Sequence, residues 1–431
     1  MNDLTTPLSL ENVSVNAIKV VNRLVEHGYE AYLVGGCIRD LMLGATPKDF
    51  DVATSAHPEE VRELFRNSRL IGKRFRIVHV RFGREIVEVS TFRGPHKDDH
   101  EDASGQVRDD NVYGTFEEDT FRRDFAMNAL YLRLPENEVI DLAGGIDDIK
   151  DKRIRLIGEP DQRFREDPVR MLRAVRFRAK LGFDIEDHCG DAIRDLGYLL
   201  QDIPPARLFE EVLKLMMTGH AVRTYECMKE YELFGWLFPS ARRASEEDEK
   251  ADRLITAALA STDRRIENDQ PVTPAFIFAA LLWYPFVIEK ARLENEEKAT
   301  SVTASHEAAG TVLANQQLFT SIPRRFSGPM RDIWNLQFRL PMRFGNKPDS
   351  LMAHKRFRAA YDFLLLREES GEKLGGIGEW WTQYQEADEE GRNKLKQQAG
   401  KSGGGGNRKR RRRRKRRPEH HDRMTPHPTF P

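Results

Sequence analysis

The stretch AYLVGGCIRDLMLGATPKDFDVAT, residues 31–54, predicts a strand, a glycine turn, a helix, a second turn and a second strand. Gly35 and Gly36 lack a Cβ atom, so the backbone there can approach a phosphate closely, and the N–H groups that open the following helix would face that anion. Arg39 falls in the first turn of this helix, where its guanidinium could clamp a triphosphate. A glycine pair alone is more often only a tight turn, so the prediction depends on the residues after the turn.

Two aspartates, Asp49 and Asp51, lie in KDFDVAT (residues 48–54). Side chains alternate across a strand, so the two carboxylates should point the same way. They would repel each other unless a cation lay between them, and Mg²⁺ favours such oxygen ligands together with substrate phosphates. The alternative is that both are solvated turn residues, because Pro47 and Lys48 mark a turn just upstream.

A third carboxylate would complete a site for two metal ions, and two residues are candidates. Glu88 lies in EIVEVSTF, where Ile86, Glu88 and Ser90 should share one face of a strand; the alternative is an edge-strand glutamate facing water. Asp124 lies in RRDFAMNALYL and could equally cap the short helix that comes next, leaving the two preceding arginines free to meet phosphate.

The segment EDPVRMLRAVRF, residues 166–177, predicts a helix that Asp167 caps and Pro168 begins. Its apolar residues fall on one helical face, and Arg170, Arg173 and Arg176 recur along another. An arginine stripe of this kind either binds anions or is a solvated basic face.

The composition predicts more than one domain and a cytoplasmic protein. The chain has 431 residues and three distant cysteines, which fits a reducing compartment. No apolar run approaches the roughly 20 residues that span a bilayer, and the longest, residues 276–288, contains a proline, so we expect no membrane span. The N-terminus has no secretory signal pattern.

The formal net charge of zero hides a basic tail. The run RKRRRRRKRR, residues 408–417, comes after the glycine tether at 401–406, and everything beyond about residue 396 is predicted to be disordered. Such a run usually contacts nucleic acid or another anionic surface, and a solubility tail is the alternative.

Outside the first 150 residues the pattern is helical, with one expected strand at 153–157. The polar segment 94–114 predicts a mobile loop, in which a metal site formed by His96, Asp98, Asp99 and His100 is improbable. Scattered basic residues of the C-terminal half could line a path for RNA or form solvated helical faces; they are Arg324, Arg325, Arg331, Arg339, Arg343, Lys355 and Arg356.

Five motifs, in this order and spacing, carry a family resemblance: LVGGCIRD, KDFDVAT, EVSTFRG, RRDFAMNALYL and EDPVRMLRAVRF. They resemble the class II nucleotidyltransferases, the family of bacterial poly(A) polymerases and tRNA CCA-adding enzymes, over about residues 30–240. Three features favour the polymerases within this family: LIGKRFRIVHV at 70–80, DIPPARLFEEVLKLM at 202–216, and the arginine-rich tail.

The resemblance implies an α+β fold with a mixed-sheet, polymerase-β-like head followed by helices. We expect an N-terminal segment (1–29), the catalytic head (30–150), a helical neck that binds nucleotide and RNA (151–205), a helical body and legs that bind RNA (206–395) and a disordered tail (396–431).

The resemblance also implies roles for individual residues. Asp49 and Asp51 would ligate two Mg²⁺ ions, with Asp124, ranked slightly ahead, or Glu88 as the further essential carboxylate. Gly36, Arg39, Arg93, Arg170 and Arg173 match positions that hold the nucleotide, and the pair Asp167 and Arg170 would read the base. Adenine and cytosine both present an amine beside a ring nitrogen, so this pair does not decide between ATP alone and CTP with ATP.

The expected activity is template-independent transfer of AMP from ATP to RNA 3′ ends, of mRNA and other RNAs, with release of pyrophosphate. A tRNA CCA-adding enzyme is the first alternative, and a non-catalytic RNA-binding protein that uses the basic tail is the second. The resemblance further suggests a monomer with partners among RNA-degradation or RNA-chaperone proteins.

Overall fold

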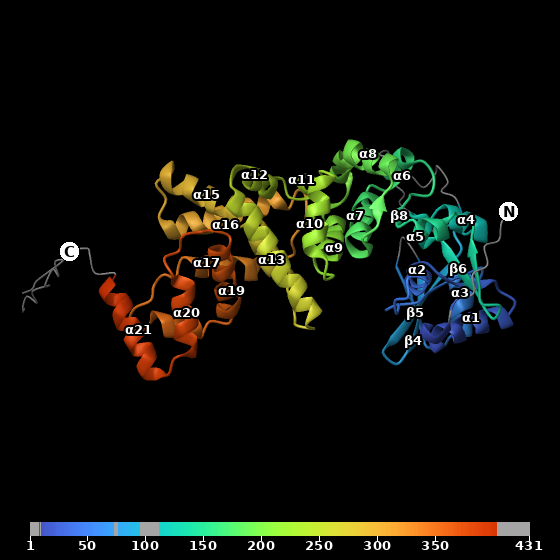
Figure 1. Ribbon diagram of the computed structural model, residues 1–431, viewed down its shortest axis with the longest axis horizontal. Coiled ribbons are helices and arrows are strands. Elements are labelled where there is room, and N and C mark those ends of the chain that lie inside the picture. Colours follow the sequence, from blue (N-terminus) through green and yellow to red (C-terminus); the bar gives the residue numbers. More distant parts are fainter. Residues whose placement is uncertain (1–7, 9, 73–75, 95–111, 403–431) are drawn as a thin grey trace, which may run out of the picture.

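The computed structural model describes residue 8 and residues 10–72, 76–94 and 112–402 (Figure 1). The central part of the predicted polar loop and the arginine-rich run at 408–417 lie outside the described residues, as does the candidate metal cluster at 96–100.

A seven-stranded sheet forms the core of the head, with the strand order β3-β4-β5-β2-β1-β6-β7. Strands β2 and β5 pair in parallel, and the other neighbouring strands pair antiparallel, so the sheet is mixed as predicted. The strands are β1 (Ala31–Val34), β2 (Asp51–Thr54), β3 (Ser68–Ile71), β4 (Ile77–Phe82), β5 (Glu85–Thr91), β6 (Leu130–Arg133) and β7 (Glu138–Asp141).

Helix α1 (Val15–Glu26) packs on one face of this sheet. Ser14 accepts hydrogen bonds from the Asn16 and Ala17 N–H groups and caps the helix, whose apolar stripe of Ala17, Val20, Val21 and Leu24 is buried. The stripe joins the same core as the strand residues. Helix α1 therefore packs as part of the head, although the expected boundary after residue 29 would place it in a separate N-terminal segment. The remaining head helices are α2 (Gly36–Met42), α3 (Pro58–Leu64), α4 (Phe116–Phe121) and α5 (Gly145–Lys150).

The chain beyond the head is helical and extends away from it as an elongated body (Figure 1). The expected strand at 153–157 is only the two-residue β8 (Arg153–Ile154), which pairs with β9 (Asp184–Ile185), a strand that the sequence did not predict. The four helices nearest the head are α6 (Pro160–Glu166), α7 (Val169–Leu181), α8 (Asp187–Leu196) and α9 (Pro205–Met216). Mixed sheet and helical remainder confirm the α+β class.

Twelve further helices complete the described part of the chain, and their apolar faces form the core of the C-terminal half. They are α10 (Ala221–Glu230), α11 (Phe234–Leu237), α12 (Pro239–Glu247), α13 (Glu249–Glu267), α14 (Pro274–Leu281), α15 (Trp283–Asn295), α16 (Ser301–Gln316), α17 (Arg324–Gln337), α18 (Lys347–Met352), α19 (Phe357–Glu369), α20 (Ile377–Glu386) and α21 (Glu389–Ser402).

The longest apolar run folds into helices α14 and α15. Among the described residues no single helix is long and apolar enough to cross a bilayer; these two meet the criteria only together, and they bend by 52° at their junction. The Phe286 ring is fully buried and stacks on Trp334 at 4.6 Å between ring centroids, so the pair serves as a core element of the helical half.

The predicted disordered segment starts too early. Helix α21 continues to Ser402, and Lys396, the first residue of that segment, forms an ion pair with Asp349 at 3.0 Å. Leu395 and Ala399 pack against the small core around Trp381, and this long-range packing explains why local composition failed to predict the helix.

We predict that Gly145→Ala destabilises the head. A Cβ atom at Gly145, the first residue of α5, would overlap the Ala126 carbonyl oxygen, and this backbone cannot yield as a flexible side chain would. Forced overlap should cost about 1–3 kcal/mol and lower the Tm in thermal unfolding followed by circular dichroism. The control is Gly310→Ala within α16, where a Cβ meets nothing within 4 Å and should raise stability by up to about 1 kcal/mol. Equal Tm values for the two variants would refute the close approach.

Candidate active site

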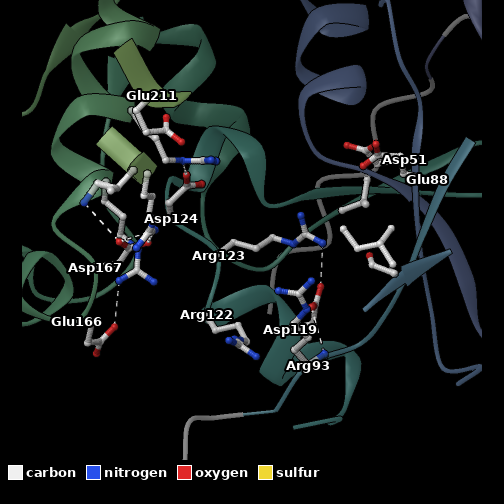
Figure 2. Close-up of a pocket in the computed structure, with 17 residues that line it drawn as sticks. Asp51, Glu88, Arg93, Asp119, Arg122, Arg123, Asp124, Glu166, Asp167 and Glu211 are labelled. Atoms are coloured by element: carbon white, nitrogen blue, oxygen red, sulfur yellow. Dashed lines mark hydrogen bonds and ion pairs between the residues drawn. The ribbon is translucent and has the colours of Figure 1, made fainter. Parts of the chain in front are cut away.

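A pocket of about 390 Å³ lies between the head sheet and helices α6, α7 and α9 (Figure 2). Seven of the residues predicted for the site line it: Asp51, Glu88, Arg93, Asp124, Asp167, Arg170 and Arg173. Asp49, Gly35, Gly36 and Arg39 do not belong to its lining. The segment Asp119–Asp124 crosses the pocket between the sheet and the helices, so the lining has a sheet end, a middle and a helix end.

The sheet end carries Asp51 and Glu88 side by side. Asp51 opens β2, Glu88 lies in β5, and the two are Cα partners in the parallel ladder. Partial desolvation by the surrounding pocket atoms, with the negative charges of Glu88 and Asp49, raises the pKa of Asp51 to about 6 against the opposing effect of Arg123, although the side chain itself still reaches solvent. Two carboxylates therefore face each other across adjacent strands.

Strand β5 alternates as expected. Val87, Val89 and Thr91 are buried, whereas Glu88 and Ser90 face the pocket side. Glu88 also contacts His79 on β4 with 3.2 Å between Nε2 and Oε1. Because β5 lies between β4 and β2, Glu88 does not occupy an edge strand of the described sheet.

Asp49 differs from the prediction, because it lies two residues before β2 begins. The neighbouring Phe50 is buried and anchors this segment in the core, while Asp49 is exposed. Exposed and buried side chains thus alternate from Asp49 through Phe50 to Asp51, where the paired part of β2 begins. The negative charge of Asp49 still raises the pKa of Asp51.

The sheet end fits a divalent cation in its chemistry. Oxygen donors of Asp51, Glu88 and nearby Asp49 are the ligand type that Mg²⁺ prefers. Desolvation first, and then the like charges of Glu88 and Asp49, raise the pKa of Asp51, and a cation would offset these charges. Within the described ranges, no three histidine, cysteine or carboxylate side chains are already gathered as a metal site. Glu88 contacts His79, so it would have to leave this contact in order to bind an ion.

The middle of the pocket is organised by Asp119, which the sequence analysis missed. Asp119 is buried and accepts hydrogen bonds from Arg123 Nη2 (2.9 Å), from the Tyr131 hydroxyl (2.8 Å) and from the Arg93 backbone N–H (3.2 Å). The sequence did hold a signal for this ion pair, because Asp119 lies four residues before Arg123 near the end of the short helix α4. Figure 2 shows Arg123 between Asp124 on one side and Asp51 with Glu88 on the other.

Arg123 also lies beside the glycine turn. A Cβ atom at Gly35 would come within 3.9 Å of Arg123 Nη1, and Gly35 has a φ of +88°, which favours glycine. The helix after the turn begins at Gly36, the second glycine of the predicted turn.

Arg39 is buried away from the pocket lining. Its guanidinium donates to Asn128 Oδ1 (2.5 Å) and Asp40 Oδ1 (2.6 Å) and lies 5.4 Å from the centroid of the Phe177 ring on α7. The contact with Phe177 links α2 to α7, and the hydrogen bond to Asn128 links α2 to the segment before β6. A direct role of Arg39 in holding the triphosphate stays a prediction.

Asp124 lies at the helix end, apart from Asp51 and Glu88 (Figure 2). Its Oδ2 accepts from Arg173 Nε at 2.5 Å and its Oδ1 from the Phe125 N–H at 2.9 Å. Burial alone would raise the pKa of Asp124, but the charge of Arg173 and these hydrogen bonds hold it below its usual range. The short helix η3 (Ala126–Asn128) has Phe125 at its N-cap, so Asp124 serves as an ion-pair partner there.

The predicted base-reading pair is held by neighbouring residues. Arg207 on α9 donates from Nη2 to both carboxylate oxygens of Asp167 at 2.9 Å. Arg170 Nη1 donates to the Arg163 carbonyl (2.7 Å) and to Glu166 Oε2 (3.1 Å). Arg207 was missed, although it falls in the quoted segment 202–216; its partner is 40 residues away, which local patterns do not reveal.

Helix α7 begins at Val169, one residue later than predicted, although Pro168 already has helical torsion angles. Its apolar stripe of Leu172, Val175 and Ala179 is buried, as expected, and Arg170 and Arg173 reach the pocket.

We predict that Asp124→Asn lowers stability by about 1.5–3 kcal/mol at pH 7, because a charged hydrogen-bond partner of Arg173 is lost. Since the folded pKa of Asp124 is depressed, its contribution is full above about pH 4 and is lost as the pH falls through the folded pKa. The free energy of unfolding of the unmodified chain and of Asp124→Asn should be measured in urea between pH 8 and pH 3. The difference between the two proteins should narrow only at the acid end. Asp191→Asn, at an exposed carboxylate of α8, is the control; a gap that widens on acidification would contradict the ion pair.

Three family models match the chain. One described as "Poly A polymerase head domain" matches residues 31–155, one described as "Probable RNA and SrmB- binding site of polymerase A" matches residues 182–244, and one described as "Polymerase A arginine-rich C-terminus" matches residues 297–417.

Curated relatives match over most of the chain. Poly(A) polymerase I of Escherichia coli O6:H1 is 48% identical over 389 residues, which cover 88% of this chain and 84% of that protein. Poly(A) polymerase I of Haemophilus influenzae is 45% identical over 401 residues, covering 91% and 89%. The CCA-adding enzyme of Lactobacillus helveticus is 39% identical over 226 residues, covering only 52% of this chain and 55% of that enzyme.

Solved structures share the fold. A tRNA-processing enzyme in an apo form has a TM-score of 0.60 at 22% identity, covering 92% of this chain and 99% of that chain. The Thermotoga maritima CCA-adding enzyme has a TM-score of 0.55 at 18% identity, covering 93% and 100%. With head motifs, helical remainder and near full-length relatives in agreement, the chain is an adenylyltransferase of the poly(A) polymerase I family.

Proposed function

We propose that the chain adds AMP from ATP to RNA 3′ ends without a template and releases pyrophosphate. The observation that carries this proposal is the composition of one pocket: paired carboxylates at the sheet end, arginines in the middle and an aspartate–arginine pair at the helix end. These are the three chemical needs of nucleotidyl transfer, namely metal ligands, phosphate contacts and base contacts.

Asp51 and Asp49, with Glu88 as the third carboxylate, would hold two Mg²⁺ ions. When bound, these ions supply Lewis acidity, which favours the ionised 3′ hydroxyl and balances charge on the departing pyrophosphate. The position of Glu88 opposite Asp51 in the ladder supports it over Asp124 for this role, while Asp124 would act by holding Arg173 toward the nucleotide.

The middle of the pocket would orient the triphosphate. Asp119 and Tyr131 fix the Arg123 guanidinium beside Gly35, so the charge is in place before the nucleotide arrives. The 3′ hydroxyl would then attack the α-phosphate in line, with pyrophosphate leaving on the opposite side.

At the helix end, Asp167 would accept a hydrogen bond from the exocyclic amine and Arg170 would donate to the ring nitrogen. Arg207 uses part of the acceptor capacity of Asp167, and Glu166 with the Arg163 carbonyl engages one nitrogen of Arg170. The remaining donors and acceptors suit the amine and ring nitrogen that adenine presents, an edge that cytosine shares.

The first alternative, a CCA-adding enzyme, has the support of the head motifs and the shared fold. The match to CCA-adding relatives covers about half of the chain, whereas poly(A) polymerase I relatives match nearly all of it, which favours polyadenylation. We also propose a cytoplasmic monomer, consistent with three free cysteines, whose protein partners act in RNA degradation or remodelling.

We predict that Asp51→Ala abolishes AMP incorporation, lowering the rate at least about 10³-fold, because the loss of a metal ligand removes several kcal/mol of transition-state stabilisation. Incorporation of labelled AMP into an oligoribonucleotide measures this. Asp147→Ala, at an exposed head carboxylate on α5, should keep its rate and provides the control. Unchanged circular dichroism of Asp51→Ala, together with near-normal synthesis, would defeat the assignment.

Incubating the chain with a generic RNA and each triphosphate separately tests the reaction itself. ATP should yield a long homopolymer, and CTP should yield little product. Addition of two or three residues to tRNA, dependent on CTP, would support the CCA-adding alternative, and no pyrophosphate release with any triphosphate would support a non-catalytic RNA-binding protein.

A further inference from the structure

An exposed apolar patch with basic neighbours lies between helices α17 and α18. The side chains of Met342 and Phe344 are 40% and 48% exposed. By contrast, Trp381 and Tyr384 in the small core of the C-terminal half are fully buried. Arg339, Arg343 and Lys347 surround the two exposed side chains in sequence. We call these five residues, Arg339, Met342, Arg343, Phe344 and Lys347, the leg patch.

Two cations of the leg patch lie against apolar groups of this region. Lys347 Nζ is 4.4 Å from the centroid of the Phe344 ring and 3.6 Å from Met342 Sδ. Arg343 lies over the Trp380 ring at 5.8 Å. Arg339, Met342 and Lys347 also line a hollow of about 310 Å³, which Asn346, Ser350 and Leu351 complete.

The acid nearest to the leg patch in sequence, Asp349, is engaged with other partners. Asp349, in the first turn of α18, accepts a hydrogen bond from the Tyr384 hydroxyl at 2.6 Å and forms an ion pair with Lys396 at 3.0 Å. The Asp349 carboxylate is therefore already balanced from α21, and the leg patch itself has three basic residues and no acidic one.

The leg patch also lies beside the origin of the basic tail. A Cβ atom at Gly400 in α21 would come within 3.9 Å of Phe344 Cβ. The run RKRRRRRKRR begins at residue 408, six residues after Ser402 ends α21, and six residues span at most roughly 21 Å. Helices α17, α20 and α21 lie at the opposite end of the molecule from the head sheet (Figure 1).

We propose that the leg patch binds single-stranded RNA upstream of the 3′ end that enters the head pocket. A base stacks on Phe344, and Arg339, Arg343 and Lys347 contact phosphates, which is the combination that recurs where proteins hold single strands. An acidic protein segment would match the charges but would leave an aromatic ring exposed beside them. The proposal rests on the proposed function only in that the bound strand is the one being extended.

The test compares binding of fluorescent oligoadenylates of 8 and 40 nucleotides to the full chain without ATP. Phe344→Ala should raise the Kd for the 40-mer about fivefold, the effect of losing about 1 kcal/mol of stacking. Arg339→Gln with Lys347→Gln should lower the slope of log Kd against log salt by about 1.4, as expected for two lost phosphate contacts. Binding and extension of the 8-mer, which occupies the head, should not change.

Matched controls separate the leg patch from general surface effects. Leu318→Ala and Arg358→Gln remove an apolar and a basic side chain that are 73% and 74% exposed elsewhere in the C-terminal half, and both should bind the 40-mer normally. Phe344→Trp keeps a stacking surface and should retain binding, which guards against misfolding of the alanine variant.

Two results would overturn the proposal. The first is unchanged 40-mer affinity and salt slope in both patch variants. The second is self-association of the unmodified chain, seen by ultracentrifugation and lost in Phe344→Ala, with RNA binding intact, which would make the patch an interface between copies. The Asp51→Ala chain should bind the 40-mer normally, so failure of the leg patch appears in binding, whereas failure of the proposed activity appears in AMP incorporation.

Discussion

The parallel pairing of β2 with β5 is the constraint on which the site depends, because it sets Asp51 and Glu88 opposite each other. Two like charges at such spacing repel by a few kcal/mol in a partly screened environment. Val52, Val87 and Val89 are buried behind them, and full burial of each contributes about 1.5–3 kcal/mol. The sheet core can therefore hold the carboxylates together before any cation arrives, and the repulsion from Glu88 adds to the desolvation that raises the pKa of Asp51.

The two ends of the pocket belong to different parts of the chain, and polar contacts align them. Arg163 on α6 donates from Nη2 to the Arg122 and Arg123 carbonyls at 2.6 and 2.8 Å, and Arg173 on α7 holds Asp124. Each contact joins a helix of the neck to the segment that leaves the head. The distance between the carboxylates at the sheet end and the Asp167–Arg170 pair at the helix end is thus set by hydrogen bonds from arginines to backbone and carboxylate oxygens. These tolerate less displacement than apolar packing, because hydrogen bonds weaken steeply as their geometry departs from ideal.

The sequence predicted what local periodicity encodes. Alternation in β5 and the two stripes of α7 depend on spacing within one element, so Glu88, Arg170 and Arg173 were placed on the correct faces. Partnerships across 40 or 49 residues, such as Arg207 with Asp167 and Arg173 with Asp124, have no local signal. The first appears only when α9 packs beside α7, and the second only when α7 packs on the segment that leaves the head. The same reason explains β9 and the last turns of α21, whose stability comes from distant partners.

The charge balance of the pocket argues that nucleotide and metal bind together. Its lining holds six arginines (Arg93, Arg122, Arg123, Arg170, Arg173, Arg207) against seven carboxylates (Asp51, Glu88, Asp119, Asp124, Glu166, Asp167, Glu211). Because the positive and negative charges of the pocket lining nearly cancel, the lining as a whole offers little net attraction to a triphosphate, wherever each guanidinium lies. Divalent cations at the sheet end would convert its excess of negative charge into an attraction for the phosphates, while the arginines already paired with acids would keep their orientation. For the proposed reaction, affinity for ATP would therefore depend on the carboxylates of β2 and β5 as much as on the arginines.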